Sequence, residues 1–413
     1  MLRLHPFAAL RPRPDAAQKL ACPPYDVMNR QEAAALAQGN ALSFLHVTRA
    51  EIDLPETVSA YDDRVYEAAK RTFDRFAQEG VLLREQRPCL YAYRQEAVLA
   101  GRSVSQIGIV ACCHIDDYSE GRIKKHEVTR KDKEDDRTRH TLQIRANAGP
   151  VFLAHRPDAQ ISKLVTAAAA SAPLYDFTAE DSVRHTVWRI DDTSPLVASF
   201  GELGCAYVAD GHHRSASAAR AGAELRRDNP QHTGEEEYNW FLCVLFSSEQ
   251  LNVLPYHRLV RDLGGLSPDA FLQRLRAIAE VTATTTPIAE QPGGFGLFLG
   301  GRWYRVQLPA SAIPASDPVR SLDYVLLSDH VLAPLLGIAD LRTDKRIDFV
   351  GGIRGTGELE RRVSSGEHAL AFAMRATSLE QLMAVADAGL IMPPKSTWFE
   401  PKLRSGLLIH TLD

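Results

Sequence analysis

Two spacings of apolar residues alternate along the chain and predict a mixture of helices and strands. In residues 56–79 apolar side chains recur every three or four positions, the spacing of an amphipathic helix, and Gly80 would end it. Residues 104–115 and 238–246 are nearly continuous apolar runs, as expected of strands in the middle of a sheet. The pattern therefore predicts an α+β fold with a mixed-sheet core.

The order of these elements predicts two lobes and a terminal segment. Residues 1–262 would form a core lobe, and residues 263–390 a second α/β lobe with a helix at 321–336. Residues 391–413 combine prolines with two large aromatic side chains, which are unusual in a free tail, so this segment is expected to pack back on the body. The short apolar run 43–47 is interpreted as a strand.

Composition limits the classes of function. The 413 residues are 45% hydrophobic and 24% charged with a formal net charge of -4, and no long basic run is present. Nucleic acid and anionic membranes are therefore not expected as partners. The sequence contains neither a good signal peptide nor an apolar stretch long enough to span a bilayer, so a cytoplasmic location is expected. The six cysteines lack C-x-x-C spacing, which predicts buried, reduced thiols.

Residues 210–214, Asp-Gly-His-His-Arg, follow an apolar run and precede small residues, a pattern that predicts a strand, a tight turn and a helix. The amides at the start of a helix have no partners within it, so the turn is a natural anion site. Gly211 would let the anion approach closely, and Arg214 would grip a phosphate with two hydrogen bonds. Ser215 would add a hydroxyl, and His212 and His213 would neutralise or donate.

Asp210 has two open roles at this turn. A carboxylate would repel the anion unless it bound magnesium or acted as a general base. The structural alternative is that Asp210 caps the helix and pairs with Arg214. Adjacent side chains on a helix diverge, so His212 and His213 are not expected to bind the same metal ion.

Two further segments carry candidate substrate-binding groups. Residues 22–27 contain two prolines that stiffen the backbone and present Tyr25 and Asp26 in a defined place, although a surface turn would read the same way. Residues 124–137 mix both signs of charge, as a solvated helix does, yet they follow a buried strand, where loops often carry ligand groups. This placement makes His126 and Glu127 candidates.

The last candidates are a cation and a hydroxyl in the proline-rich terminal segment, Lys395 and Ser396. They are assigned to the acceptor pocket that the turn lacks by itself.

Five segments of the chain resemble, in order, an uncharacterised prokaryotic family called domain of unknown function 1015. They are residues 22–27, 125–129, 145–152, 209–214 and 392–402. The Gly-His-His-Arg element is also similar to the phosphate-binding turn of the ParB and sulfiredoxin fold, which includes free serine kinases. Sulfiredoxin carries a reactive cysteine where this chain has His212 or His213, and the DNA-binding helices of ParB are not seen here.

The resemblance implies a kinase-type phosphotransferase that forms O-phosphoserine from ATP or ADP with Mg²⁺. It would place phosphates on the residues from Gly211 to Arg214 and Asp210 near the transferred group or the magnesium ion. The order of the segments makes Glu127 the candidate base that activates the acceptor hydroxyl. A phosphoester hydrolase using the same turn and a non-enzymatic, ParB-like nucleotide-binding module are the alternatives, and a homo-oligomer is left open.

Overall fold

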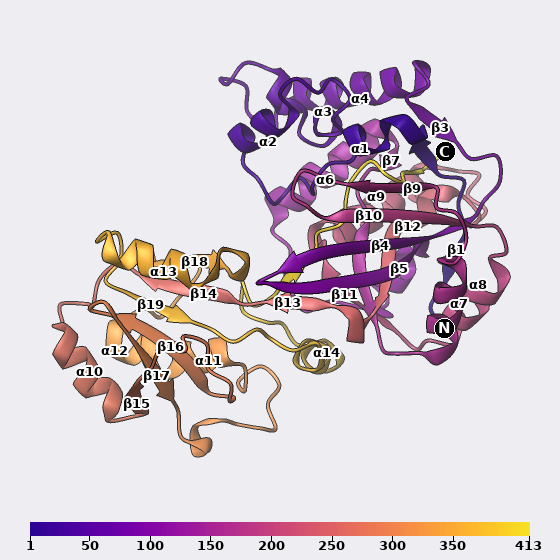
Figure 1. Ribbon diagram of the computed structural model, residues 1–413. Coiled ribbons are helices and arrows are strands. Elements are labelled where there is room, and N and C mark those ends of the chain that lie inside the picture. The colour runs from indigo at the N-terminus through magenta and orange to yellow at the C-terminus, as the bar shows by residue number, and fades with distance from the viewer. The chain divides into compact units, whose positions relative to one another are not determined.

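The computed structural model describes residues 1–413, and the chain divides into two units (Figure 1). Unit 1 comprises Met1–Val98, Arg102–Leu251 and Pro401–Asp413, and unit 2 comprises Leu99–Gly101 and Asn252–Glu400. The sequence placed these breaks after residues 262 and 390. Each unit has its own sheet and its own hydrophobic core, which confirms the α+β class.

Unit 1 is built on a nine-stranded sheet in the order β6-β11-β8-β12-β5-β4-β10-β9, with β1 paired to β5. Because β11 is parallel to β6, β12 is parallel to β8 and the other pairs are antiparallel, the sheet is mixed, as predicted. The strands are β1 (Leu4–His5), β4 (Leu90–Leu99), β5 (Arg102–His114), β6 (Ile123–Lys124), β8 (Val151–His155), β9 (Tyr175–Thr178), β10 (Arg184–Ile190), β11 (Ala206–Asp210) and β12 (Trp240–Ser247).

Helices of unit 1 enclose two hydrophobic clusters. One lies between the sheet and helices α5, α7, α8 and α9, and includes Phe200, Val208 and Phe241. The other lies under α1, α3 and α4 and includes Phe44 and Phe76. The helices are α1 (Ala17–Leu20), α2 (Arg30–Ala37), α3 (Leu45–Thr48), α4 (Asp63–Gln78), α5 (Ile115–Ser119), α6 (Lys131–Ile144), α7 (Ala159–Ala168), α8 (Ser194–Gly201) and α9 (His212–Asp228).

Helix α9 sits close against its neighbours because one of its inward positions is glycine. A Cβ atom on Gly222 would lie 2.3 Å from the carbonyl oxygen of Tyr238 and 2.8 Å from Ile115 Cδ1. The glycine therefore lets α9 approach Ile115 of α5 and the backbone of Tyr238 closely.

Residues Pro401–Asp413 belong to unit 1 although unit 2 precedes them in the chain. Within this segment β21 (His410–Thr411) pairs with β7 (Ala146–Asn147), and Ser405 and Ile409 form isolated bridges with Cys22 and Leu10. A further two-stranded sheet pairs β2 (Leu10–Pro12) with β3 (Leu82–Arg84). The last segment is therefore hydrogen-bonded to three separate parts of unit 1, near residues 10, 22 and 147.

Unit 2 contains a six-stranded antiparallel sheet in the order β15-β17-β16-β19-β14-β18. Strands β16 and β17 form a hairpin. A helical segment lies near 321–336, where the sequence predicts it, but it consists of α11 and α12 joined by a π-helical turn at Ser328–Leu332. The elements are β13 (Asn252–Leu254), β14 (Tyr256–Val260), β15 (Glu280–Ala283), β16 (Gly294–Leu299), β17 (Arg302–Gln307), β18 (Ile347–Gly351), β19 (Leu370–Ala373), β20 (Trp398–Glu400), α10 (Pro268–Arg276), α11 (Asp323–Leu327), α12 (Ala333–Leu336), α13 (Gly355–Ser364) and α14 (Leu379–Asp387).

Three local predictions need correction. The run at 43–47 is not a strand, because its apolar residues form the short helix α3, which packs on α4. Helix α4 begins at Asp63, where the side chain of Asp62 accepts a hydrogen bond from Arg64 N–H at 3.0 Å, and not at residue 56. Only the second half of the charged segment is helical, since residues 125–130 form a loop before α6.

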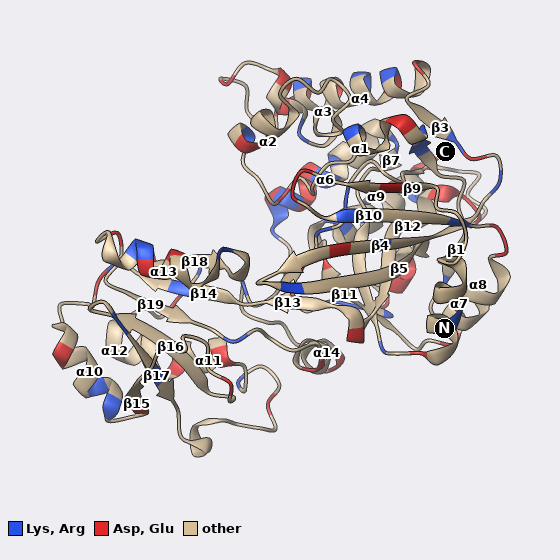
Figure 2. Ribbon diagram, in the orientation of Figure 1, with Lys and Arg blue, Asp and Glu red and all other residues tan.

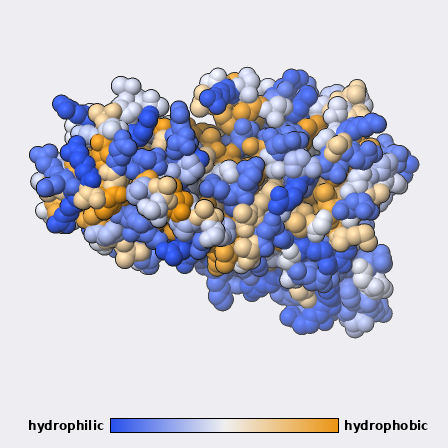
Figure 3. Space-filling model, turned by 90° about the horizontal axis from the view of Figure 1, so that it is seen from below, coloured by the Kyte–Doolittle hydropathy of each residue, from blue (hydrophilic) through white to orange (hydrophobic).

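The surface agrees with the composition. Basic and acidic residues are both spread over the two units (Figure 2). The face shown in Figure 3 is mostly hydrophilic, with hydrophobic residues scattered over it. All six cysteines are free thiols and five are buried, as predicted. None of the helices combines the length and the apolar character needed to cross a bilayer.

Candidate functional site

The candidate site is the predicted turn between β11 and α9. The strand ends at Asp210, Gly211 adopts a left-handed conformation with φ of 98°, and α9 begins at His212. A register shift in the pairing of β11 with β8 lies between Val208 and Asp210, so a bulge re-aims the end of the strand. The first amides of α9 have no partner within the helix and carry its partial positive charge.

Arg214 folds back over this turn. Its Nη2 lies 2.7 Å from Asp210 Oδ2, and its Nη1 donates a hydrogen bond to the carbonyl oxygen of Pro150. A Cβ atom on Gly211 would lie 3.1 Å from the guanidinium carbon of Arg214, so the glycine makes room for this side chain. The pairing with Asp210 agrees with the structural alternative, although Asp210 does not cap the helix. Arg214 thus connects the turn to Pro150, which precedes β8.

Lys402 completes a cluster of charges around Asp210. Its Nζ lies 3.3 Å from Asp210 Oδ1. Burial alone would raise the pKa of Asp210, but the charges of Lys402 and Arg214 outweigh burial and hold the pKa well below its usual range. Both carboxylate oxygens therefore face cations, and magnesium would reach Asp210 only by displacing one of them.

The backbone around Lys402 is fixed by two glutamines of the sheet. Gln95 Nε2 donates to the Lys402 carbonyl oxygen at 2.8 Å, and Gln106 Nε2 donates to Gln95 Oε1 at 3.0 Å and to the Pro401 carbonyl oxygen at 3.3 Å. Sequence reasoning did not select Lys402. Its signal was its place as the second lysine of the proline-rich terminal segment.

His212 faces two residues from another part of the chain. Because β6 runs parallel to β11, with Tyr207 opposite Lys124, residues 126 and 127 emerge beside the turn. The rings of His126 and His212 are 4.5 Å apart and perpendicular, and His212 Nδ1 lies 3.8 Å from Glu127 Oε2. Burial lowers the pKa of His126 to about 4, and burial together with His126 lowers the pKa of His212 well below its ordinary value.

His213 points elsewhere, as expected for adjacent helical residues. Its Nε2 accepts a hydrogen bond from the Arg130 backbone N–H at 3.0 Å. Burial lowers the pKa of His213, and the nearby charge of Asp26 opposes that shift. Asp26 also helps Asp210 to raise the pKa of Arg214 against the effect of burial. The exposed Asp26 therefore lies within electrostatic reach of the turn.

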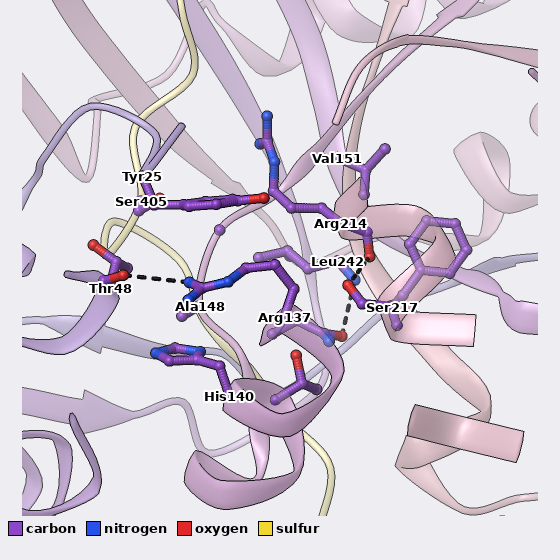
Figure 4. Close-up of a pocket in the computed structure, with 15 residues that line it drawn as sticks. Tyr25, Thr48, Arg137, His140, Ala148, Val151, Arg214, Ser217, Leu242 and Ser405 are labelled. Atoms are coloured by element: carbon purple, nitrogen blue, oxygen red, sulfur yellow. Dashed lines mark hydrogen bonds between the residues drawn. The ribbon is translucent and has the colours of Figure 1, made fainter. Parts of the chain in front are cut away.

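Tyr25 lines a cavity of about 50 Å³ next to the turn. The Arg137 guanidinium lies 4.3 Å from the centre of its ring, and Figure 4 shows the ring with Arg137 on one side and Arg214 on the other. The Tyr25 carbonyl oxygen accepts a hydrogen bond from Arg49 Nη1 at 2.7 Å. This stacking and hydrogen bond hold the stiff segment 22–27 against the site.

The chain was compared with known protein families and solved structures. The family described as a protein of unknown function, DUF1015, matches residues 4–325. The chain belongs to this family. No curated protein matches it.

Solved structures with a similar chain path include three proteins. A conserved hypothetical protein from Pyrococcus furiosus is 14% identical at a TM-score of 0.36, and the match covers 73% of this chain and 94% of that one. A mutant free serine kinase in complex with AMP is 13% identical at 0.37, covering 73% and 92%. Truncated SbnI from Staphylococcus aureus is 12% identical at 0.39, covering 73% and 87%. At TM-scores this low, the likeness carries no argument about chemistry.

The remaining predicted site residues are one hydroxyl of α9 and two residues of the other unit. Ser215 is fully buried, and its hydroxyl donates to the carbonyl oxygens of Gly211 and His212. Lys395 and Ser396 belong to unit 2. There the Lys395 carbonyl oxygen accepts from Arg258 Nη2 at 3.1 Å, and Ser396 Oγ donates to the Pro393 carbonyl oxygen at 2.7 Å.

Proposed function

We propose that the protein is a small-molecule phosphotransferase that acts like a free serine kinase, transferring a phosphoryl group from ATP or ADP to the hydroxyl of serine or a similar compound. One observation carries the proposal. The start of α9, with its unpaired amides and the cation Lys402, lies beside the half-exposed carboxylate of Glu127. A phosphate site and a proton acceptor at one turn are the two groups that phosphoryl transfer requires.

The turn supplies the phosphate side. Gly211, with φ of 98°, makes the tight turn from β11 into α9, and the first amides of α9 are the proposed phosphate donors. Lys402, with its side chain 15% exposed, adds a positive charge at the same place. Two nitrogens of Arg214 are already bonded, one to Asp210 and one to the Pro150 carbonyl oxygen. We therefore assign Arg214 the role of holding the turn in place rather than that of binding the phosphate.

Magnesium is not assigned a ligand on this chain. Each oxygen of Asp210 faces Lys402 or Arg214, and this arrangement does not fit a magnesium ion held by that carboxylate. Magnesium commonly binds the phosphates of a nucleotide and keeps several waters, so it would arrive with the donor. The role that we propose for Asp210 is to hold the two cations.

Glu127 supplies the acceptor side. Its side chain is 43% exposed, and Oε2 lies beside His212. The carboxylate takes the proton of the acceptor hydroxyl while the hydroxyl oxygen forms a bond to the terminal phosphorus. The bond from that phosphorus to the bridging oxygen breaks, and the departing nucleotide keeps the electron pair.

The test is direct. Purified protein, serine, magnesium and either ATP or ADP are incubated, and O-phosphoserine is measured by mass spectrometry. Asp210→Asn is expected to lower turnover by about 100-fold, because Lys402 and Arg214 lose the group that positions them. The matched control is Asp192→Asn, an exposed residue for which full activity is expected.

Three results would contradict the proposal. Release of inorganic phosphate without an acceptor would favour the phosphoester hydrolase. Nucleotide binding without turnover would favour the ParB-like module. Absence of product with every member of a panel of small hydroxyl compounds would remove the kinase assignment altogether.

A further inference from the structure

Three buried nitrogen atoms beside the turn have no hydrogen-bond partner. They are Nδ1 and Nε2 of His126 and Nε2 of His212. The two residues are only 2% and 5% exposed. Buried polar groups in native proteins are nearly always paired, so three unpaired nitrogens in one place indicate a ligand that the protein chain itself does not supply.

The two imidazoles do not satisfy each other. Their rings are perpendicular with centres 4.5 Å apart, which is an edge-to-face contact. A neutral imidazole keeps one unprotonated ring nitrogen, whose lone pair can bind a metal ion. A carboxylate oxygen of Glu127 lies 3.8 Å from the second ring.

We propose that His126, Glu127 and His212 bind one divalent transition-metal ion. One possible ligand atom from each residue lies within 4.8 Å of the others. Because an ion bonded at about 2.1 Å holds its ligands no more than about 4.2 Å apart, the three side chains close slightly around it. Two imidazoles and one carboxylate suit zinc, manganese, iron or cobalt, whereas magnesium prefers oxygen ligands.

His213 is excluded from the site by its own contact. Its Nε2 already accepts the Arg130 N–H at 3.0 Å. The two adjacent histidines therefore have different surroundings: His212 faces the proposed metal site, and His213 is bonded to the loop that precedes α6. This difference provides a matched pair of variants.

Three protein ligands leave coordination positions open for water or a substrate oxygen. The role of the ion in catalysis rests on the proposed function, under which it would bind the acceptor hydroxyl next to the phosphate turn. Glu127 would then bind the ion through one oxygen and keep the other for the acceptor proton. Metal binding itself does not depend on that function.

The experiment measures metal binding alone. The full chain is stripped with a chelator, and Zn²⁺, Mn²⁺, Co²⁺ or Mg²⁺ is titrated without nucleotide or acceptor by calorimetry, with Co²⁺ also followed by its visible absorption. We expect one transition-metal ion per chain and weaker Mg²⁺ binding. His212→Gln and Glu127→Gln should weaken Co²⁺ binding at least about 100-fold, whereas His213→Gln should leave it unchanged.

Glu127→Gln keeps the test decisive if the buried His212→Gln variant fails to fold, because the Glu127 side chain is 43% exposed. The inference is overturned if no transition metal binds more tightly than Mg²⁺, or if Co²⁺ binds Glu127→Gln as it binds the unmodified chain. Since no nucleotide is present, either result leaves the serine kinase assay to be judged separately.

Discussion

Gly211→Ala tests whether the turn requires a residue without a side chain. The backbone of Gly211 has a φ of 98°, in the left-handed region, where an L-residue costs about 1–2 kcal/mol. The new Cβ atom would also lie 3.1 Å from the Arg214 guanidinium, which Asp210 and Pro150 hold in place. Such crowding adds about 1–3 kcal/mol, so a loss of about 2–5 kcal/mol in the free energy of unfolding is expected.

Urea unfolding followed by circular dichroism measures this loss against a matched control. A Cβ atom on Gly204 would meet no atom within 4 Å, and its φ is not in the left-handed region. Gly204→Ala should therefore be neutral or stabilise the protein by about 0.4–1 kcal/mol. The reasoning is refuted if Gly211→Ala costs no more than Gly204→Ala.

A double-mutant cycle separates the two contributions. In an Arg214→Ala background the crowding at Gly211 is removed, and only the backbone cost of about 1–2 kcal/mol should remain. An equal cost of Gly211→Ala in both backgrounds would show that the contact with Arg214 has no energetic effect. The same variants, assayed for O-phosphoserine, link the shape of the turn to the proposed activity.

Three other predictions concern charge and exposure. The hydrogen bond to Asp53 raises the pKa of His46, so the stability that this pair contributes is fully present below about pH 6.5 and is lost as pH rises through the folded-state pKa. In urea unfolding, Asp53→Asn should therefore destabilise the protein more at about pH 5.5 than at about pH 8.5. Equal losses at the two pH values would contradict this. Cys205 is the only cysteine that is not buried, so a thiol reagent should label one cysteine of the native chain and six after denaturation; rapid labelling of a second would argue against the packing. Lys402→Met should weaken ATP binding about 10-fold by calorimetry, whereas Lys70→Met on α4 should not; equal effects would remove Lys402 from the phosphate site.

The turn was predictable because its signals lie next to one another in the chain. An apolar run, a glycine and a series of small residues indicate strand, turn and helix without reference to any distant segment. The diverging directions of His212 and His213 also follow from helix geometry alone. Local rules were therefore enough to describe how the backbone passes through the site.

The composition of the site was not predictable in the same way. His126 and Glu127 reach His212 because β6 pairs with β11, and this pairing joins segments more than 80 residues apart. Lys402 pairs with Asp210 although residues 252–400, which belong to unit 2, separate the two in the sequence. No periodicity specifies such pairings, since any strand of suitable pattern could have taken the place of β6.

The error at residues 43–47 has a related cause. A short apolar run fits a buried strand and a buried turn of helix equally well, and its neighbours decide between them. Here Phe44 and Val47 lie in the cluster under α4, together with Phe73. Residues 45–48 form the helix α3 where they pack against α4, and the apolar run by itself does not distinguish this helix from a strand.

The placement of Pro401–Asp413 in unit 1 has a consequence for synthesis of the protein. A ribosome makes residues 1–251, then Asn252–Glu400 of unit 2, and only then the segment that carries Lys402 and pairs with β7. The nascent first unit must therefore wait with an incomplete edge and an uncompensated Asp210 while unit 2 is made and folds. Under the proposed function, an interrupted translation product would lack Lys402, and with it one cation of the proposed phosphate site, even though it contains the whole Asp-Gly-His-His-Arg turn.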